Sequence, residues 1–177
     1  MDADQRRQSF ELLADTVVEP LRRYLARRTD PATAEDVLAD VLLVLWRRLH
    51  TVPAQLLPYA YGVAHHCLAN AHRSARRQQR VAARIAVMDP PAASRAHNDE
   101  PDERVTAALQ SLRPAEAELL RLWAWEELGP SEIAAVLNIT ANAAAIRLHR
   151  AREKFKEAIG KVSGGTGHEL TDEGTRL

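Results

Sequence analysis

The stretch GPSEIAAVLNITANAAAIRLHRAREKF, residues 129–155, brings hydrogen-bonding and cationic side chains together at helical spacing. From Ala141 to Val162, six basic side chains stand against two acidic ones. Amide, imidazole and guanidinium groups hydrogen-bond to base edges, and cations neutralise phosphates. This pattern favours a helix that reads DNA, and the structural alternative is a pair of ordinary packed helices. The face in question carries Asn142, Ala145, Ile146, His149 and Arg150, with Arg147 and Lys154 beside it.

A second cationic group comes earlier in the chain and follows one stripe of a predicted helix. Its spacing of i, i+3, i+4, i+7 and i+11 places all five arginines on the same face. Solvated helix faces often carry arginine, but five like charges without an acid among them repel one another. The stripe therefore favours a polyanionic partner. Its members are Arg73, Arg76, Arg77, Arg80 and Arg84.

Other chemistries find less support in the residue pattern. His65 and His72 share a helix face, but Cys67 points away from it, and a tetrahedral metal site needs four convergent ligands. The sequence contains neither a glycine-rich phosphate loop nor a supported Ser/His/Asp arrangement. We therefore expect a protein without metal, cofactor or catalytic activity of its own.

Composition predicts an all-α protein that is soluble and cytoplasmic. The 177 residues include 46% hydrophobic but only 5% aromatic residues, and runs of strand-favouring residues are missing. Cys67 is the single cysteine, which excludes an intrachain disulfide. The N-terminus lacks the apolar core of a signal peptide, and the apolar run 37–46 is shorter than the ~20 residues of a membrane span.

Apolar periodicity predicts the helices of the N-terminal half. A first helix is expected over about residues 5–28. Asp30 is the expected N-cap of a second helix, which runs through Leu49 and stops before Pro53. This helix is apolar over more than one stripe, so it is buried or meets a partner. A loop over residues 50–57 precedes a third helix that begins at Pro58 or Tyr59.

The opening stretch has the local signals of a helix-turn-helix. Ser131 is the expected N-cap of the first helix, Asn138 stands where a left-handed residue ends it, and Thr140 is the N-cap of the second. The buried face of the second helix is predicted at Ala144, Leu148, Ala151 and Phe155. Three prolines in MDPPAASRAHNDEPDE, residues 88–103, indicate a flexible linker, so we expect two small helical domains joined by a tether.

These residues carry a resemblance to a known family. LRPAEAELLRLWAWEELGPSEIAAVLNITANAAAIRLHRAREKFKEAI resembles the C-terminal DNA-reading domain of a bacterial sigma factor of the extracytoplasmic-function type, group 4 of the sigma-70 family. DPATAEDVLADVLLVLWRR is similar to its core-polymerase-binding helix, and PYAYGVAHHCLANAHRSARR to its promoter-melting helix. The three motifs stand in the family's order, and the resemblance covers about residues 9–160.

The resemblance implies an organisation and a function. Residues 5–86 would form sigma region 2, residues 87–103 a flexible linker, residues 104–162 region 4, and residues 163–177 a disordered tail. The chain would bind core RNA polymerase, at the clamp of the largest subunit and the flap of the second largest, and direct initiation at promoter DNA. An anti-sigma factor is an expected partner. The alternatives are a helix-turn-helix regulator that acts without polymerase, and a helical adaptor for acidic proteins.

The resemblance also implies roles for individual residues. Contacts to core polymerase would come from Asp36, Asp40, Leu43, Trp46 and Arg47. The minus-ten element would be bound by Tyr59, Tyr61, His65, His66, Asn70, Arg73, Arg76 and Arg77, with tyrosines stacking on bases and arginines on phosphates. The minus-35 bases would meet Asn142, Ile146 and His149, and its phosphates Arg147, Arg150 and Lys154.

The chain departs from the family pattern at four positions, and these put promoter preference in doubt. His65 and His66 replace a usual Arg-Asn pair, Asn70 replaces an acid, and Ala145 stands where a lysine is common.

Overall fold

The computed structural model describes residues 3–85 and 103–164, and side chains within 3–80 and 103–161. All regular elements in these ranges are helical, as the composition predicts. The predicted linker, the tail and the side chain of Arg84 lie mostly or wholly outside the described residues. The elements are α1 (Ala3–Ala26), α2 (Pro31–Arg47), the 3-10 turn η1 (Leu49–Thr51), α3 (Leu56–Ile85), α4 (Glu103–Ser111), α5 (Pro114–Ala124), α6 (Pro130–Leu137) and α7 (Ala141–Gly164).

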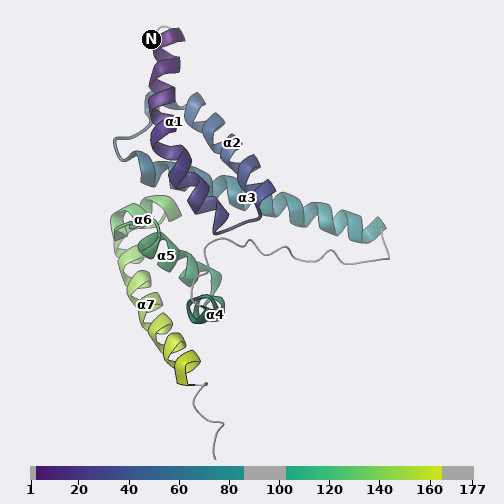
Figure 1. The fold of residues 1–177 in the computed structure, drawn as a ribbon, viewed down its shortest axis with the longest axis vertical. Coiled ribbons are helices and arrows are strands. Elements are labelled where there is room, and N and C mark those ends of the chain that lie inside the picture. The colour runs from purple at the N-terminus through teal and green to yellow at the C-terminus, as the bar shows by residue number, and fades with distance from the viewer. Residues whose placement is uncertain (1–2, 86–102, 165–177) are drawn as a thin grey trace, which may run out of the picture.

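Helices α1 to α3 form the N-terminal half, whose core is aliphatic with one tyrosine. Val17, Leu21 and Tyr24 of α1 are fully buried against Val41 and Leu45 of α2 and the start of α3. Figure 1 shows α1 and α2 side by side above α3. The apolar stripes that predicted these helices are therefore the surfaces that pack together.

Local signals fix the ends of these helices, with two corrections to the predicted bounds. Asp30 caps α2, because its Oδ1 accepts a hydrogen bond of 3.0 Å from the Thr33 amide. However, α2 ends at Arg47, slightly before the expected end at Leu49, and a 3-10 turn follows. Helix α3 begins at Leu56 instead of Pro58 or Tyr59, because proline is accepted in the first turn of a helix, where its missing amide hydrogen is not needed.

Helices α4 to α7 form the C-terminal half, in which α6 and α7 make the predicted helix-turn-helix. Asn138 ends α6 in the left-handed conformation, with φ 52° and ψ 51°. Thr140 then caps α7, and its Oγ1 accepts a hydrogen bond of 3.2 Å from the Ala143 amide. The prediction of Ser131 as N-cap of α6 is wrong. Gly129 holds that position, since Pro130 already starts the helix and the Glu132 carboxylate accepts from the Gly129 amide at 2.8 Å.

The two halves are packed against each other in this structure. Helix α6 lies against α3, and Figure 1 shows α5 and α6 directly below it. At Gly62 of α3, a Cβ atom would stand 3.6 Å from the Cα of Val136 in α6. This is an ordinary van der Waals distance, so the two helices pack closely and a Cβ atom would still fit between them. The sequence pattern predicted the two domains but not this contact between them.

Candidate nucleic-acid interface

The solvent face of α7 carries the three side chains predicted to read bases. Asn142, Ile146 and His149 are all exposed, and Ile146 retains 45% of its accessible surface. An exposed aliphatic side chain between polar ones suits contact with a thymine methyl group. The opposite face of the helix is in the core, where the predicted positions are buried or half-buried: Ala144, Leu148, Ala151 and Phe155.

Three exposed cations flank that face of α7. Arg147 and Arg150 extend from the first half of the helix, and Lys154 follows one turn later. The Lys154 ammonium forms an ion pair with Glu116 of α5, which lowers the pKa of that carboxyl group. Exposed ion pairs contribute little to stability, so this pair leaves the lysine available to a phosphate.

Helix α3 presents a second polar face with the arginines predicted for the minus-ten element. His66, Asn70, Arg73, Arg76 and Arg77 are exposed. Asn70 accepts a hydrogen bond from the Arg73 guanidinium, so these two side chains are held together. Tyr59 lies half-buried at the start of the helix. Six of the eight predicted minus-ten residues thus lie on an accessible or partly accessible surface.

Two predicted minus-ten residues, Tyr61 and His65, lie toward the protein interior. Tyr61 is only 6% exposed, its ring centroid is 5.2 Å from that of Tyr24, and burial raises the pKa of Tyr61. It has no free face for a base in this arrangement. His65 is half-buried beside the C-terminal half, and this burial lowers the pKa of His65 despite the nearby Glu118 carboxylate.

Helix α2 presents acidic and apolar groups at one surface. Asp36, Asp40 and Arg47 are exposed, and Leu43 keeps 45% of its accessible surface. Trp46 is half-buried. It packs edge-to-face on Phe10 with ring centroids 5.1 Å apart, and the Arg6 guanidinium lies 4.6 Å from its ring centroid. Trp46 therefore secures α1 on α2, whereas the other four predicted contact residues face solvent.

A cleft of about 550 Å³ separates the polar faces of the two halves. His65 and His72 of α3 line it on one side, and Leu137, Ile139 and Arg147 of the helix-turn-helix line it on the other. Residues predicted for two different promoter elements therefore border the same cleft. The sequence patterns on separate helices contain no signal for this juxtaposition.

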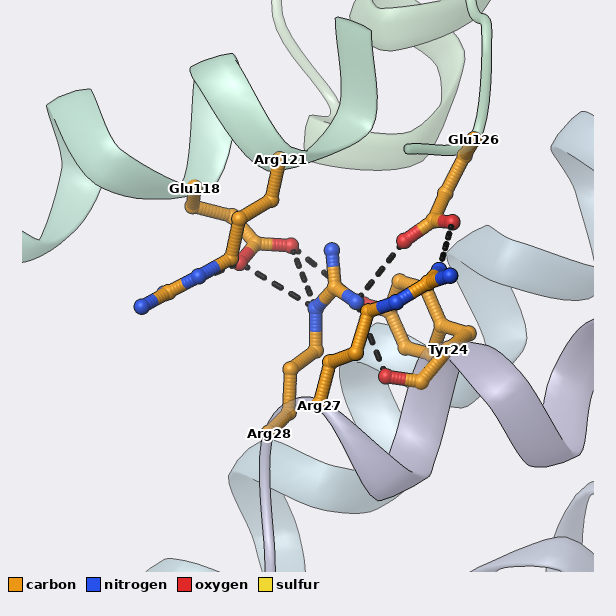
Figure 2. A network of polar contacts seen from close by, with 6 residues as sticks. All are labelled: Tyr24, Arg27, Arg28, Glu118, Arg121 and Glu126. Atoms are coloured by element: carbon orange, nitrogen blue, oxygen red, sulfur yellow. Dashed lines mark hydrogen bonds and ion pairs between the residues drawn. The ribbon is translucent and has the colours of Figure 1, made fainter. Parts of the chain in front are cut away.

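A polar network beside the cleft also escaped the sequence analysis. The side chains of Glu118 and Glu126 are only 15% and 2% exposed, although charged side chains usually lie in solvent. Both meet Arg28, which follows α1 (Figure 2). These residues are more than 85 positions apart in the sequence, so no local spacing links them.

Within 3–85 and 103–164, no three His, Cys, Asp or Glu side chains are grouped so as to hold a metal ion. In the same ranges, no helix combines the length and hydropathy needed to cross a membrane.

Comparison with known proteins finds a matching family model and a related sequence. The family model of sigma-70 region 4 matches residues 102–155, which contain α4 to α6 and most of α7. Over 172 residues the chain is 31% identical to the RNA polymerase sigma factor CarQ of Myxococcus xanthus, covering 90% of this chain and 94% of that protein.

Two solved structures share the fold. One is the sigma factor RpoE in complex with the anti-sigma factor NepR from Bartonella quintana, with a TM-score of 0.65 and 16% identity over 85% of this chain and 96% of that one. The other is CnrH in complex with the cytosolic domain of CnrY, with a TM-score of 0.60 and 18% identity over 88% and 90%. With a related sequence along nearly its whole length and a helix-turn-helix whose reading face is exposed, the chain belongs to the extracytoplasmic-function sigma factors, sigma-70-type proteins that direct promoter recognition and transcription initiation.

Proposed function

We propose that the two halves of the chain divide the work of initiation. The N-terminal half acts as sigma region 2, which binds core RNA polymerase and the minus-ten element. The C-terminal half acts as region 4, which binds the flap of the second-largest subunit and the minus-35 element. The observation that carries this proposal is the pair of exposed polar faces, on α3 and α7, one in each half.

Docking on core polymerase is assigned to α2. Asp36 and Asp40 would pair with basic side chains of the polymerase clamp, and Leu43 would supply apolar contact. An exposed leucine between carboxylates is a small apolar centre with a charged rim, the composition of many protein interfaces. Arg47 lies at the end of this surface. The Trp46 ring packs on Phe10 of α1 and so stabilises the helix that carries the surface.

Recognition of the minus-ten element is assigned to α3. Its exposed arginines follow one face and suit the backbone of a single strand, and His66 and Asn70 offer hydrogen bonds to bases. Tyr59 provides a partly accessible ring for stacking. His65 would join this surface fully only after the C-terminal half moves away from α3, whereas Tyr61 would also have to leave its contact with Tyr24 of α1.

Recognition of the minus-35 element is assigned to α7. Asn142 and His149 would hydrogen-bond to base edges, and Ile146 would contact a thymine methyl group. Arg147, Arg150 and Lys154 would hold the flanking phosphates, which fixes the depth and register of the helix in the major groove.

The remaining roles concern partners and place of action. We propose that the chain catalyses no reaction itself, works in the cytoplasm as a dissociable subunit of RNA polymerase, and is restrained by an anti-sigma factor. Two structures of similar fold contain such partners: RpoE is bound to an anti-sigma factor, and CnrH to the cytosolic domain of CnrY.

Run-off transcription with purified core polymerase tests this function. Templates from a genomic fragment library are transcribed with and without the chain, and the start sites are mapped. Specific transcripts that need both components are expected, and the sequences upstream of the starts should share two elements. The triple variant Asp36→Ala, Asp40→Ala, Leu43→Ala should fail to bind core, whereas exchange of exposed Glu19 on α1 should have no effect. Sequence-specific duplex binding without any dependence on core would contradict the proposal and favour a regulator.

A further inference from the structure

Buried ion pairs join the end of α1 to the end of α5 across the boundary between the halves. The Arg28 Nε donates to both carboxylate oxygens of Glu118, at 3.1 and 3.2 Å. The Arg28 Nη1 donates at 2.8 Å to Glu126, and the Arg27 Nη1 donates at 3.1 Å to the other oxygen of Glu126. Figure 2 shows both arginines reaching from α1 toward the glutamates of the C-terminal half.

This network has little contact with water. The side chains of Arg28 and Glu126 are 5% and 2% exposed. The Arg28 guanidinium also stacks 3.6 Å from the ring centroid of fully buried Tyr24 and donates to its carbonyl oxygen. Buried charges need partners, and the carboxylates that neutralise Arg28 both come from the other half. The network therefore exists only while the halves are packed together.

The backbone after α5 holds Glu126 in place. Glu127 adopts a left-handed conformation with φ 55°, which is unfavourable for a residue with a side chain. The Leu128 amide then donates to the Leu122 carbonyl at 3.1 Å, which closes the turn. The chain accepts an unfavourable backbone angle at the point where Glu126 is directed toward Arg27 and Arg28.

Closure is incompatible with simultaneous reading of both promoter elements. His65 and Arg147, assigned to different elements, line one cleft. Elements centred near −10 and −35 are separated by roughly 25 base pairs, or about 85 Å of straight duplex at ~3.4 Å per base pair. Closure also leaves His65 half-buried at this cleft. One half must leave the other before both elements can be bound.

We propose that Arg27, Arg28, Glu118 and Glu126 form a latch that keeps the free chain closed and inactive until a partner separates its halves. The need for opening rests on the promoter roles proposed above, whereas the latch itself does not. The charge balance of the latch makes separation of the two halves easier. Arg121 adds a third guanidinium 3.9 Å from Glu118, so the three arginines outnumber the two glutamates by one positive charge. Opening returns these charges to water.

The test measures a distance between the halves in the full-length free chain. Cys67 is replaced by serine, and spin labels are placed at exposed Asp15 of α1 and exposed Glu157 of α7. The otherwise native chain should give one narrow distance distribution. Glu126→Gln removes the charge that neutralises both arginines, and Arg28→Lys keeps the charge but loses the fork that bridges two carboxylates. Each should lower the closed-to-open ratio, by roughly 10- to 100-fold for Glu126→Gln.

Glu127→Gln is the matched control, because Glu127 is the next residue, is exposed, and loses the same charge in this substitution. It should leave the narrow distribution unchanged. Circular dichroism verifies that each variant retains its helix content. If Glu126→Gln loses helix content, the distances in Arg28→Lys and Glu118→Gln show whether the latch holds the halves together. A distribution that is already broad in the native chain, or one that stays narrow in the folded latch variants, would overturn the latch. The measurement uses neither polymerase nor DNA, so its failure and a failed transcription assay are distinguishable.

Discussion

The two helices assigned to DNA binding differ in how far the rest of the protein covers their polar faces. All the predicted minus-35 residues of α7 are exposed, and the opposite face alone enters the core. On α3, Tyr61 is buried against Tyr24 of α1, and His65 is half-buried at the cleft between the halves, whereas His66, Asn70 and the arginines are exposed. An isolated C-terminal half would therefore present the same reading face, whereas α3 gains part of its surface only on opening.

The largest expected effect concerns the freely exposed helix. The double variant Asn142→Ala, His149→Ala should reduce minus-35-dependent transcription by ~30-fold or more, because each lost base contact costs ~1–3 kcal/mol of discrimination. Competition binding with minus-35 duplexes measures the loss. Glu157→Gln, exposed farther along α7, is the control and should transcribe normally. Equal losses on promoters with and without a minus-35 element would show that α7 does not read this element.

A smaller effect is expected on α3, because arginines that contact phosphates carry no sequence information. Arg76→Ala, Arg77→Ala should weaken promoter binding about tenfold and reduce the logarithmic salt dependence by ~1 per lost contact, almost regardless of sequence. A salt titration of holoenzyme binding checks both numbers. A change in sequence preference instead of the salt slope would mean that these arginines read bases.

The same contrast shows what the sequence can predict. On α7, the apolar positions Ala144 and Leu148 recur at helical spacing, so the buried and exposed faces follow from periodicity. Asp30, Asn138 and Thr140 were correctly placed at helix ends, because capping depends on neighbours within three or four residues.

What the sequence missed depends on contacts between distant residues. Arg28 and Glu126 are 98 positions apart, and only the tertiary fold brings them together. The same holds for Trp46, which the sequence analysis named only as a polymerase contact. Its ring packs on Phe10 of another helix. Ser131 failed as a cap for a local reason, since Pro130 moved the helix start forward and Glu132 supplied the capping oxygen.

The turn of the helix-turn-helix gives the next prediction. Asn138→Ala should lower the free energy of unfolding by about 1 kcal/mol, because alanine is unfavourable in the left-handed conformation that asparagine adopts there. Asn138→Gly should be neutral or stabilising, since glycine adopts this conformation without steric cost. Urea unfolding of the three proteins measures the difference. If both substitutions destabilise equally, the asparagine side chain and not its backbone conformation is responsible.

The smallest expected effect is a dependence of closure on pH through His65. Burial beside the C-terminal half lowers the pKa of His65 below its ordinary value of 6.5, with Arg28 and His66 acting in the same direction and Glu118 opposing them. An open chain with a solvated imidazole regains the ordinary value and takes up its proton first. His65 therefore favours the closed form fully above pH 6.5, and this contribution declines as the pH falls from 6.5 to the lowered pKa.

The contribution of His65 is isolated by comparing inter-half distances from pH 8 to 5 in the native chain and in His65→Gln. Only the native chain should show the additional opening below pH 6.5. His66→Gln, at an exposed neighbouring position, should behave like the native chain. Superimposable profiles for the native chain and His65→Gln would mean that His65 stays equally shielded in both states, and that α3 does not gain this side chain on opening.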